Sequence, residues 1–334
     1  MKVDLAVIGQ GAVTPAGVGL NGLNRLSVLA TKPIKAMEGS DWPALRVDLK
    51  AEALARWQRE PRLRRASAIS YFMVEAAEQA LAGVSAAARA ETGIIAAFSA
   101  GPLAYSRRFF EGVITQGMAS PALFPETVYN SPVSHVATVL GLNGAAYALV
   151  GDESAWVAAL ITASVWLKQE RVRQVVVLGA EEFDPICLDA YRSARWLRRG
   201  NPEGGFLAAE GAGAILVRRA EPADAQVISH ARDGWIYRTK KEAAVAAESL
   251  LGESDPALPC HRSAQRNWLG PLEKKATAGR PSFPDAPYLG EAFTASAAWH
   301  TLRALNALSP QVPRLLQPVW GLNHQLGLLA LEGR

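Results

Sequence analysis

The sequence predicts a layered α/β protein with a mainly parallel sheet. Short apolar runs typical of buried strands alternate along the chain with longer segments in which apolar residues recur at helical spacing. Strands that alternate with helices in sequence commonly lie parallel in one sheet, with the helices covering its faces. The chain has 334 residues, of which 49% are hydrophobic and 20% charged, so it is long enough to bury a large core.

The first part of the chain carries the clearest pattern. Residues 3–9 form a continuous apolar run that ends in glycine, which is typical of a strand buried on both faces. Residues 66–83 have apolar residues at helical spacing and stop at a glycine, which predicts a helix. The same pattern then predicts strands at residues 92–98, 145–150, 174–179 and 212–218 and helices at residues 103–117 and 153–168.

A polar, proline-containing joint at residues 220–224 separates off a shorter second part. The pattern there predicts strands at residues 226–229, 257–261 and 326–331 and helices at residues 241–251 and 292–308. Clusters of proline and glycine at residues 200–205 and 278–287 indicate loops. The alternation of strands and helices therefore continues to the last strand.

Composition and charge exclude several classes of protein. Apolar stretches such as residues 141–150 and 155–167 are interrupted before the roughly 20 residues that a membrane span needs. Residues 1–5 predict a first strand and not a signal peptide. The net charge of only +4 argues against a basic tail that binds a polyanion, so we expect no nucleic-acid partner. A local basic patch on the surface is still compatible with this net charge. Two cysteines, Cys187 and Cys260, argue against a disulfide framework and fit a reducing, cytoplasmic compartment.

Two familiar motifs are incomplete, so the sequence predicts no cofactor and no metal. Gly9 and Gly11 follow a strand, as in a dinucleotide-binding turn, but Thr14 and Pro15 stand where the third glycine and the helix start are needed. The five histidines show no metal-ligand spacing with each other or with the cysteines.

Six short motifs follow one another along the whole chain. They are VIGQGAVTPAG (residues 7–17), PRLRRAS (61–67), NSPVSHVA with GLNG (130–137 and 141–144), AEGAG (209–213), LGEAFTASA (289–297) and WGLN (320–323). Each resembles a motif of the β-ketoacyl-acyl carrier protein synthases, which are condensing enzymes of the thiolase fold, and the order and spacing agree from residue 3 to residue 331. The chain is shorter than a usual member, with little sequence between residues 39 and 62 and a short second half.

The resemblance implies a thiolase-like five-layered α-β-α-β-α fold made of two related halves. The N-terminal half would be residues 1–219 and the shortened C-terminal half residues 220–334, so that the halves meet near the polar joint. The resemblance also implies a dimer formed through a central strand.

Active members of that family use a cysteine and two histidines, and the resemblance places Ser154, His261 and Glu291 at these positions. The family's cysteine stands at a helix N-terminus, where the helix dipole lowers its pKa and backbone N–H groups hold the oxyanion. In the matching stretch VGDESAW (residues 150–156), Ser154 is either a nucleophile that needs an adjacent base or the start of a capped helix without a catalytic role.

The two other positions differ in what they can do. Glu291 replaces a histidine that donates a hydrogen bond to an enolate, whereas an ionised carboxylate only accepts hydrogen bonds and would repel the malonyl group. His261 follows the predicted strand 257–261 and is either the remaining catalytic imidazole or a structural histidine. With these identities lost, we do not expect decarboxylative condensation.

The resemblance then leaves three functions open. The leading one is a non-condensing subunit of the chain-length-factor type. Such a subunit pairs with an active ketosynthase and shapes the acyl tunnel. It acts in fatty acid or polyketide biosynthesis, including aryl polyene pathways. The apolar segment 124–139 would suit such an interface. The second is a Ser154-dependent acyltransferase, thioesterase or decarboxylase that acts on acyl carrier protein thioesters, with His261 as its base. The third is a standalone acyl-binding homodimer.

Two arginine clusters predict a contact with an acyl carrier protein. The first includes Arg62, Arg64 and Arg65, which fall on the basic segment that resembles the family's sequence before its first long helix, and the second spans residues 192–199. Acyl carrier proteins are strongly acidic, so a basic patch would attract them. The alternative is that both clusters are ordinary solvated faces.

Overall fold

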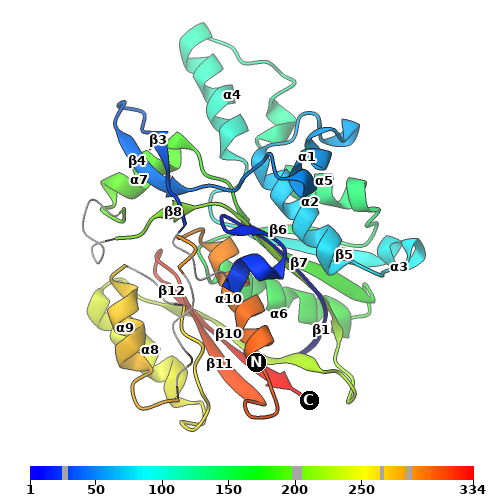
Figure 1. Cartoon of the computed structure of the whole chain (residues 1–334), viewed down its shortest axis with the longest axis vertical. Coiled ribbons are helices and arrows are strands. Elements are labelled where there is room, and N and C mark those ends of the chain that lie inside the picture. Colours follow the sequence, from blue (N-terminus) through cyan, green and yellow to red (C-terminus); the bar gives the residue numbers. More distant parts are fainter. Residues whose placement is uncertain (25–28, 198–204, 264–266, 282, 284–287) are drawn as a thin grey trace.

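The structure is a computed structural model that describes residues 1–24, 29–197, 205–263, 267–281, 283 and 288–334. Within these residues, nine strands form one long sheet (Figure 1). The strands lie in the order β11 (Arg314–Trp320), β12 (Gln325–Gly333), β10 (Gln226–Ile236), β1 (Lys2–Thr14), β9 (Gly211–Arg219), β7 (Gln174–Glu181), β5 (Thr92–Phe98) and β6 (Ala146–Val150), with β2 (Gly17–Val18) paired to β1.

The prediction of a mainly parallel sheet is wrong. Only the pairs β5–β6 and β5–β7 are parallel, and every other pair in this sheet is antiparallel. The connections explain the difference. The residues between β7 and β9 leave and return at the same end of the sheet, since Glu181 pairs with Gly211, and β11 joins β12 through residues 321–324. Neither connection crosses the sheet, as a parallel pair requires.

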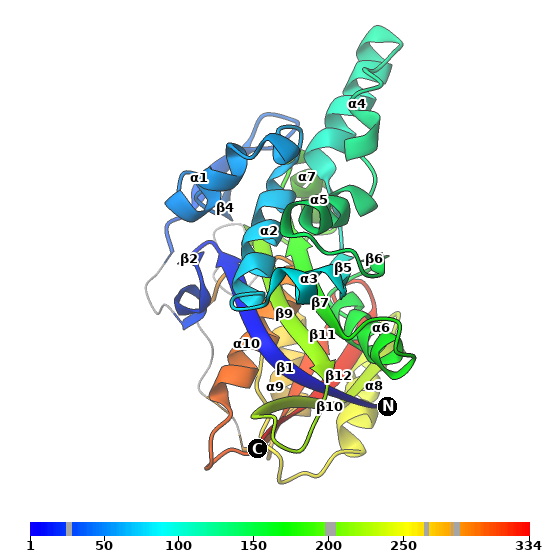
Figure 2. The ribbon, with the colours of Figure 1, turned by 90° about the vertical axis from the view of Figure 1, so that its right-hand side faces the viewer.

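Three layers of helices cover the sheet and fill its middle (Figures 1 and 2). Because side chains alternate along a strand, β7 directs Val176 and Leu178 to one side and Val175 and Val177 to the other. The outer layer on the first side contains α2 (Ala68–Ala80) and α5 (Asn130–Leu140), the middle layer contains α6 (Ala155–Lys168) and α10 (Thr294–Ala307), and the far layer contains α8 (Lys240–Gly252) and α9 (Leu269–Ala276). The five-layered α/β fold is therefore confirmed.

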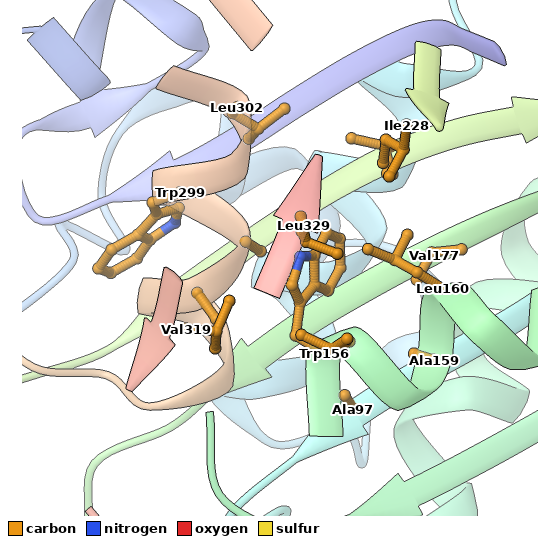
Figure 3. Packing of buried hydrophobic residues seen from close by; sticks show 14 of the residues in the cluster. Ala97, Trp156, Ala159, Leu160, Val177, Ile228, Trp299, Leu302, Val319 and Leu329 are labelled. Carbon is orange, nitrogen blue, oxygen red and sulfur yellow. The ribbon is translucent and has the colours of Figure 1, made fainter. Parts of the chain in front are cut away.

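The middle layer is a dry core between the two parts of the sheet. Trp156 of α6 is fully buried, and its indole Nε1 donates a 2.8 Å hydrogen bond to Oγ1 of Thr301 on α10. Figure 3 shows Trp156 beside Val177 from one part of the sheet and Leu329 from the other. The start of α6, where Ser154 lies, is thus fixed by packing on both sides.

The glycines of the incomplete dinucleotide motif have a packing role. A Cβ on Gly9 would lie 1.9 Å from the carbonyl oxygen of Ala80, and one on Gly11 would lie 2.0 Å from that of Ala76. Both glycines therefore let α2 cross β1 at close range.

Several elements differ from the sequence prediction. The predicted strand 257–261 makes only a single bridge, between Cys260 and Leu316, in part because Pro259 has no N–H to donate. Parts of the predicted loops 200–205 and 278–287 lie outside the described residues. Elements that the pattern did not predict are β3 (Lys32–Lys35), β4 (Asp41–Leu45) and β8 (Ala208–Ala209) of a second sheet, β2, β11, α1 (Glu52–Gln58), α3 (Ala86–Ala90), α5, α7 (Pro185–Ser193), α9 and the 3-10 turns η1 (Leu20–Asn24), η2 (Pro61–Leu63) and η3 (Phe124–Glu126).

Candidate functional site

The candidate site begins where β6 turns into α6. Ser154 immediately precedes the first residue of α6, and only 3% of its surface is exposed. Its Oγ lies 2.8 Å from Oδ1 of Asp152 and 2.5 Å from Oε1 of Gln325. The hydrogen-bond partners of the Ser154 hydroxyl are thus a carboxylate and an amide. No imidazole of the described residues bonds to it.

Two buried acids precede Ser154. Burial raises the pKa of Asp152, although its bonds to Ser154 and the nearby backbone of Gln325 act in the opposite direction. Burial also raises the pKa of Glu153 well above its usual range, and the negative charges of Glu291 and Asp152 raise it further. The N-terminus of α6 therefore lies next to acidic side chains of the same chain.

Glu291 lies beside this turn, just before α10. Its backbone pairs with the second sheet, since its N–H donates to Leu207 and its carbonyl accepts from Ala209. Its carboxyl Oε1 accepts a 2.9 Å hydrogen bond from the N–H of Phe293. Burial raises the pKa of Glu291 to about 7, so this carboxyl takes up a proton more readily than the ionised carboxylate expected from the sequence.

His261 lies near Arg303 and His300, two residues that line a cavity together with Glu291. Its backbone N–H donates to the carbonyl of Leu316, and its Nδ1 is buried without a partner among the described residues. Burial lowers the pKa of His261 to about 4, and the positive charge of Arg303 lowers it further, so the ring is neutral at pH 7. The structure brings Glu291 close to the acidic turn of Ser154, but no hydrogen bond among the described residues joins His261 to either residue.

Two small cavities lie between these groups. Glu291, His300 and Arg303 line the first, and Glu153, His300 and Gln317 line the second. Each has room for about one water molecule. Ser154 lines neither, and bulky side chains such as Trp299 and Trp320 occupy their walls. Within the described residues, these two cavities are too small for an acyl chain.

The described residues contain neither a candidate metal site nor a candidate membrane span. No cluster there brings together three or more His, Cys, Asp or Glu side chains in a way that could hold a metal ion. None of the helices in the same residues is both long enough and apolar enough to cross a membrane.

The first arginine cluster lies on the surface around η2. Arg62, Arg64 and Arg65 are all exposed. Arg62 is partly neutralised because its Nε lies 2.7 Å from Oε1 of Glu60. Arg64 and Arg65 make no ion pair within the described part of the chain. In the second cluster Arg192 pairs with acidic neighbours, and Arg198 and Arg199 lie outside the described residues.

An apolar surface surrounds the edge strand β6, which is the last strand of the sheet. On it, Tyr147 is 50% and Val150 is 52% exposed. Helix α4 (Leu103–Gln116), which follows β5 in the sequence, projects from the body (Figure 2). Further exposed apolar side chains on α4 and the following segment are Phe110, Val113, Ile114, Met118, Phe124, Val128 and Tyr129. Segment 124–139 is therefore only partly surface, since Val133 and Val136 lie on the buried face of α5.

Comparisons with known proteins agree with this architecture. The model of the beta-ketoacyl synthase N-terminal domain family matches residues 3–223. No curated protein matches the chain. Among solved structures, the ishigamide ketosynthase/chain length factor aligns with a TM-score of 0.82 and 18% identity over 99% of both chains.

Two further solved structures are similar over both full lengths. A beta-ketoacyl synthase from Burkholderia phymatum STM815 has a TM-score of 0.74 and 17% identity over 100% of both chains. AntDE:AntF, a type II PKS acyl-carrier protein in complex with its ketosynthase bound to the hexaketide, has a TM-score of 0.75 and 13% identity, also over 100% of both chains. At these identities the likeness shows a shared fold.

Proposed function

Because this chain belongs to the β-ketoacyl synthase family, we propose that it is a non-condensing member, a chain-length-factor-type subunit that pairs with an active ketosynthase in fatty acid or polyketide biosynthesis. The observation that carries the proposal is the state of Ser154, which stands at the position of the family's cysteine. Its hydroxyl is bonded to Asp152 and Gln325, and the start of its helix faces three buried acids. A nucleophile needs an adjacent base, and Ser154 has no such imidazole among the described residues.

Pairing is supported by the edge strand β6 and its apolar surroundings. β6 is an edge strand, so its outer backbone N–H and C=O groups can pair with a strand of a second chain. Its half-exposed Tyr147 and Val150 add apolar surface that such a chain can bury. One structure with a similar fold is that of a ketosynthase/chain length factor. We propose that an active ketosynthase covers this surface. A homodimer of the same chain is the alternative occupant.

The organisation and location of the chain are part of the proposal. We propose residues 1–219 and 220–334 as two related halves, because the turn after Arg219 carries the chain from β9 on one side of β1 to β10 on the other. We also propose a cytoplasmic location, since Cys187 and Cys260 are both free and buried.

Replacing Ser154 with Ala should leave the output of the pathway nearly unchanged. The substitution removes a hydroxyl that is hydrogen-bonded to Asp152 and Gln325 and to no imidazole among the described residues. Product formation in cells that carry the substituted gene is the measurement, with the amount of dimer as a control for folding. Loss of product with the dimer intact would make Ser154 a nucleophile and favour the acyltransferase, thioesterase or decarboxylase function.

Reversing the charges of Arg62, Arg64 and Arg65 to Glu should slow association with the acyl carrier protein roughly tenfold at low salt, because a basic patch steers an acidic partner. Each exposed pair alone contributes only about 0.2–1 kcal/mol, so single substitutions should have little effect. The measurement is the association rate at low and moderate ionic strength.

A triple reversal of Lys241, Lys274 and Lys275 is the matched control, since these residues are exposed on α8 and α9. Equal association rates for the two folded triple variants would remove the arginine surface from carrier-protein docking, and would leave the partner subunit alone to receive the carrier protein.

A further inference from the structure

The connection between β11 and β12 lies directly on the start of α6. The backbone N–H of Leu322 donates a 3.1 Å hydrogen bond to Oε2 of Glu153, and the amide side chain of Gln325 reaches Oγ of Ser154. The approach is close enough that a Cβ on Gly321 would lie 2.0 Å from Oδ2 of Asp152. Residues 321–325, here named the capping loop, therefore cover Ser154.

Two backbone N–H groups at this point have acidic partners from the chain itself. Ser154 N–H donates a 3.0 Å hydrogen bond to Oδ1 of Asp152, and Leu322 N–H donates to Glu153. One N–H from a helix N-terminus and one from a neighbouring loop are the kind of donors that hold an anion or a developing oxyanion. In this chain Asp152 and Glu153 occupy both donors.

Other contacts hold the capping loop from its opposite side. The hydroxyl of Tyr237 donates to the carbonyl of Gly321, and the backbone N–H of Tyr237 donates a 3.0 Å hydrogen bond to the carbonyl of His324. Tyr237 is only 1% exposed. Because His324 has a φ of 76°, in the left-handed region, the loop turns sharply at this residue. Tyr237 thus supports the loop while the two acids bind its inner face.

We propose that Asp152 and Glu153 form an internal clamp that occupies the anion-binding N–H groups at the start of α6 and keeps the capping loop closed over Ser154. A thioester carbonyl then cannot reach Ser154, and no free N–H group is left there to bind its oxygen. The clamp deepens the proposed non-condensing role, because it closes the site independently of the identity of residue 154. Its test uses the isolated chain, so a negative result would leave ketosynthase pairing untouched.

The test follows the exposure of a thiol placed beneath the loop. In the Ser154→Cys variant the new thiol should react slowly with iodoacetamide, since Ser154 is buried under the capping loop. Cys187 and Cys260 give a low background, because burial raises the pKa of Cys187 to about 12 and that of Cys260 to about 11. Adding Glu153→Ala removes the acceptor of the Leu322 N–H and should raise the alkylation rate about tenfold, as expected for the loss of one buried hydrogen bond.

Two matched variants separate the clamp from general destabilisation. Adding Glu153→Gln keeps an oxygen acceptor for Leu322 and should keep alkylation slow. Adding Glu182→Ala removes a buried acid that binds the N–H groups of Ile69 and Ala104, away from the loop, and should also keep it slow.

Amide hydrogen exchange at Leu322 gives a second measurement that needs no introduced cysteine. Exchange should be slow in the original sequence and about tenfold faster in Glu153→Ala, for the same loss of an acceptor. Equal alkylation rates with and without Glu153→Ala, or unchanged exchange at Leu322, would overturn the clamp.

Discussion

Replacing Tyr147 with Glu should abolish stable pairing with the ketosynthase. Tyr147 lies on the edge strand β6, is 50% exposed in the single chain and would be covered when a second chain pairs with that edge. Burying an unpaired carboxylate between two strands costs several kcal/mol, so the dissociation constant of the pair should rise at least about 100-fold. Sedimentation of the co-expressed subunits at several concentrations measures this change.

Val245→Glu is the matched control for that substitution. Val245 is 57% exposed on α8, a helix that covers the opposite end of the sheet, so the variant also puts an acid on an exposed apolar residue. It should pair as the original chain does. If the Tyr147 variant pairs equally well, β6 is not the interface, and the surface on α4 would have to be tested in its place.

Replacing Trp156 with Ala should destabilise the chain by about 3–5 kcal/mol, the usual cost of removing a large aromatic side chain from a core. Trp156 lies in the middle helix layer, where its ring packs between both parts of the sheet (Figure 3) and its Nε1 bonds to Thr301. The free energy of unfolding in denaturant is the quantity to measure.

Trp156→Phe distinguishes packing from the hydrogen bond. It keeps most of the buried ring but removes the donor to Thr301, so its cost should be clearly smaller than that of Trp156→Ala. A loss below about 1 kcal/mol for the Ala variant would contradict a close-packed middle layer.

Much of the fold follows from local patterns in the sequence. Strand β5 was predicted at the residues where it is found, because both of its faces are buried and its apolar run is unbroken. The helix prediction for residues 153–168 agrees closely with α6. Strand direction could not be predicted in this way. It depends on the end of the sheet at which the chain re-enters it at Gly211, and a hydrophobic pattern contains no information about that.

The candidate site could be predicted only in part. The resemblance predicts Ser154 and Glu291 as site positions, and the structure brings Glu291 close to the acidic turn before Ser154. The role of Asp152 and Glu153 was not visible in the sequence, because Leu322 lies 169 residues from Glu153 along the chain. From the sequence, Asp152 and Glu153 predict a good helix start and a charge that opposes an anionic nucleophile, but no contact with Leu322. His261 was linked to the site through a strand that proved to be a single bridge.

The native mass of the chain co-expressed with a ketosynthase encoded beside it tests the central proposal most directly. We expect one complex that contains one copy of each chain, formed through the apolar edge of β6. A chain that purifies as a monomer or as a homodimer in the presence of that ketosynthase would contradict it.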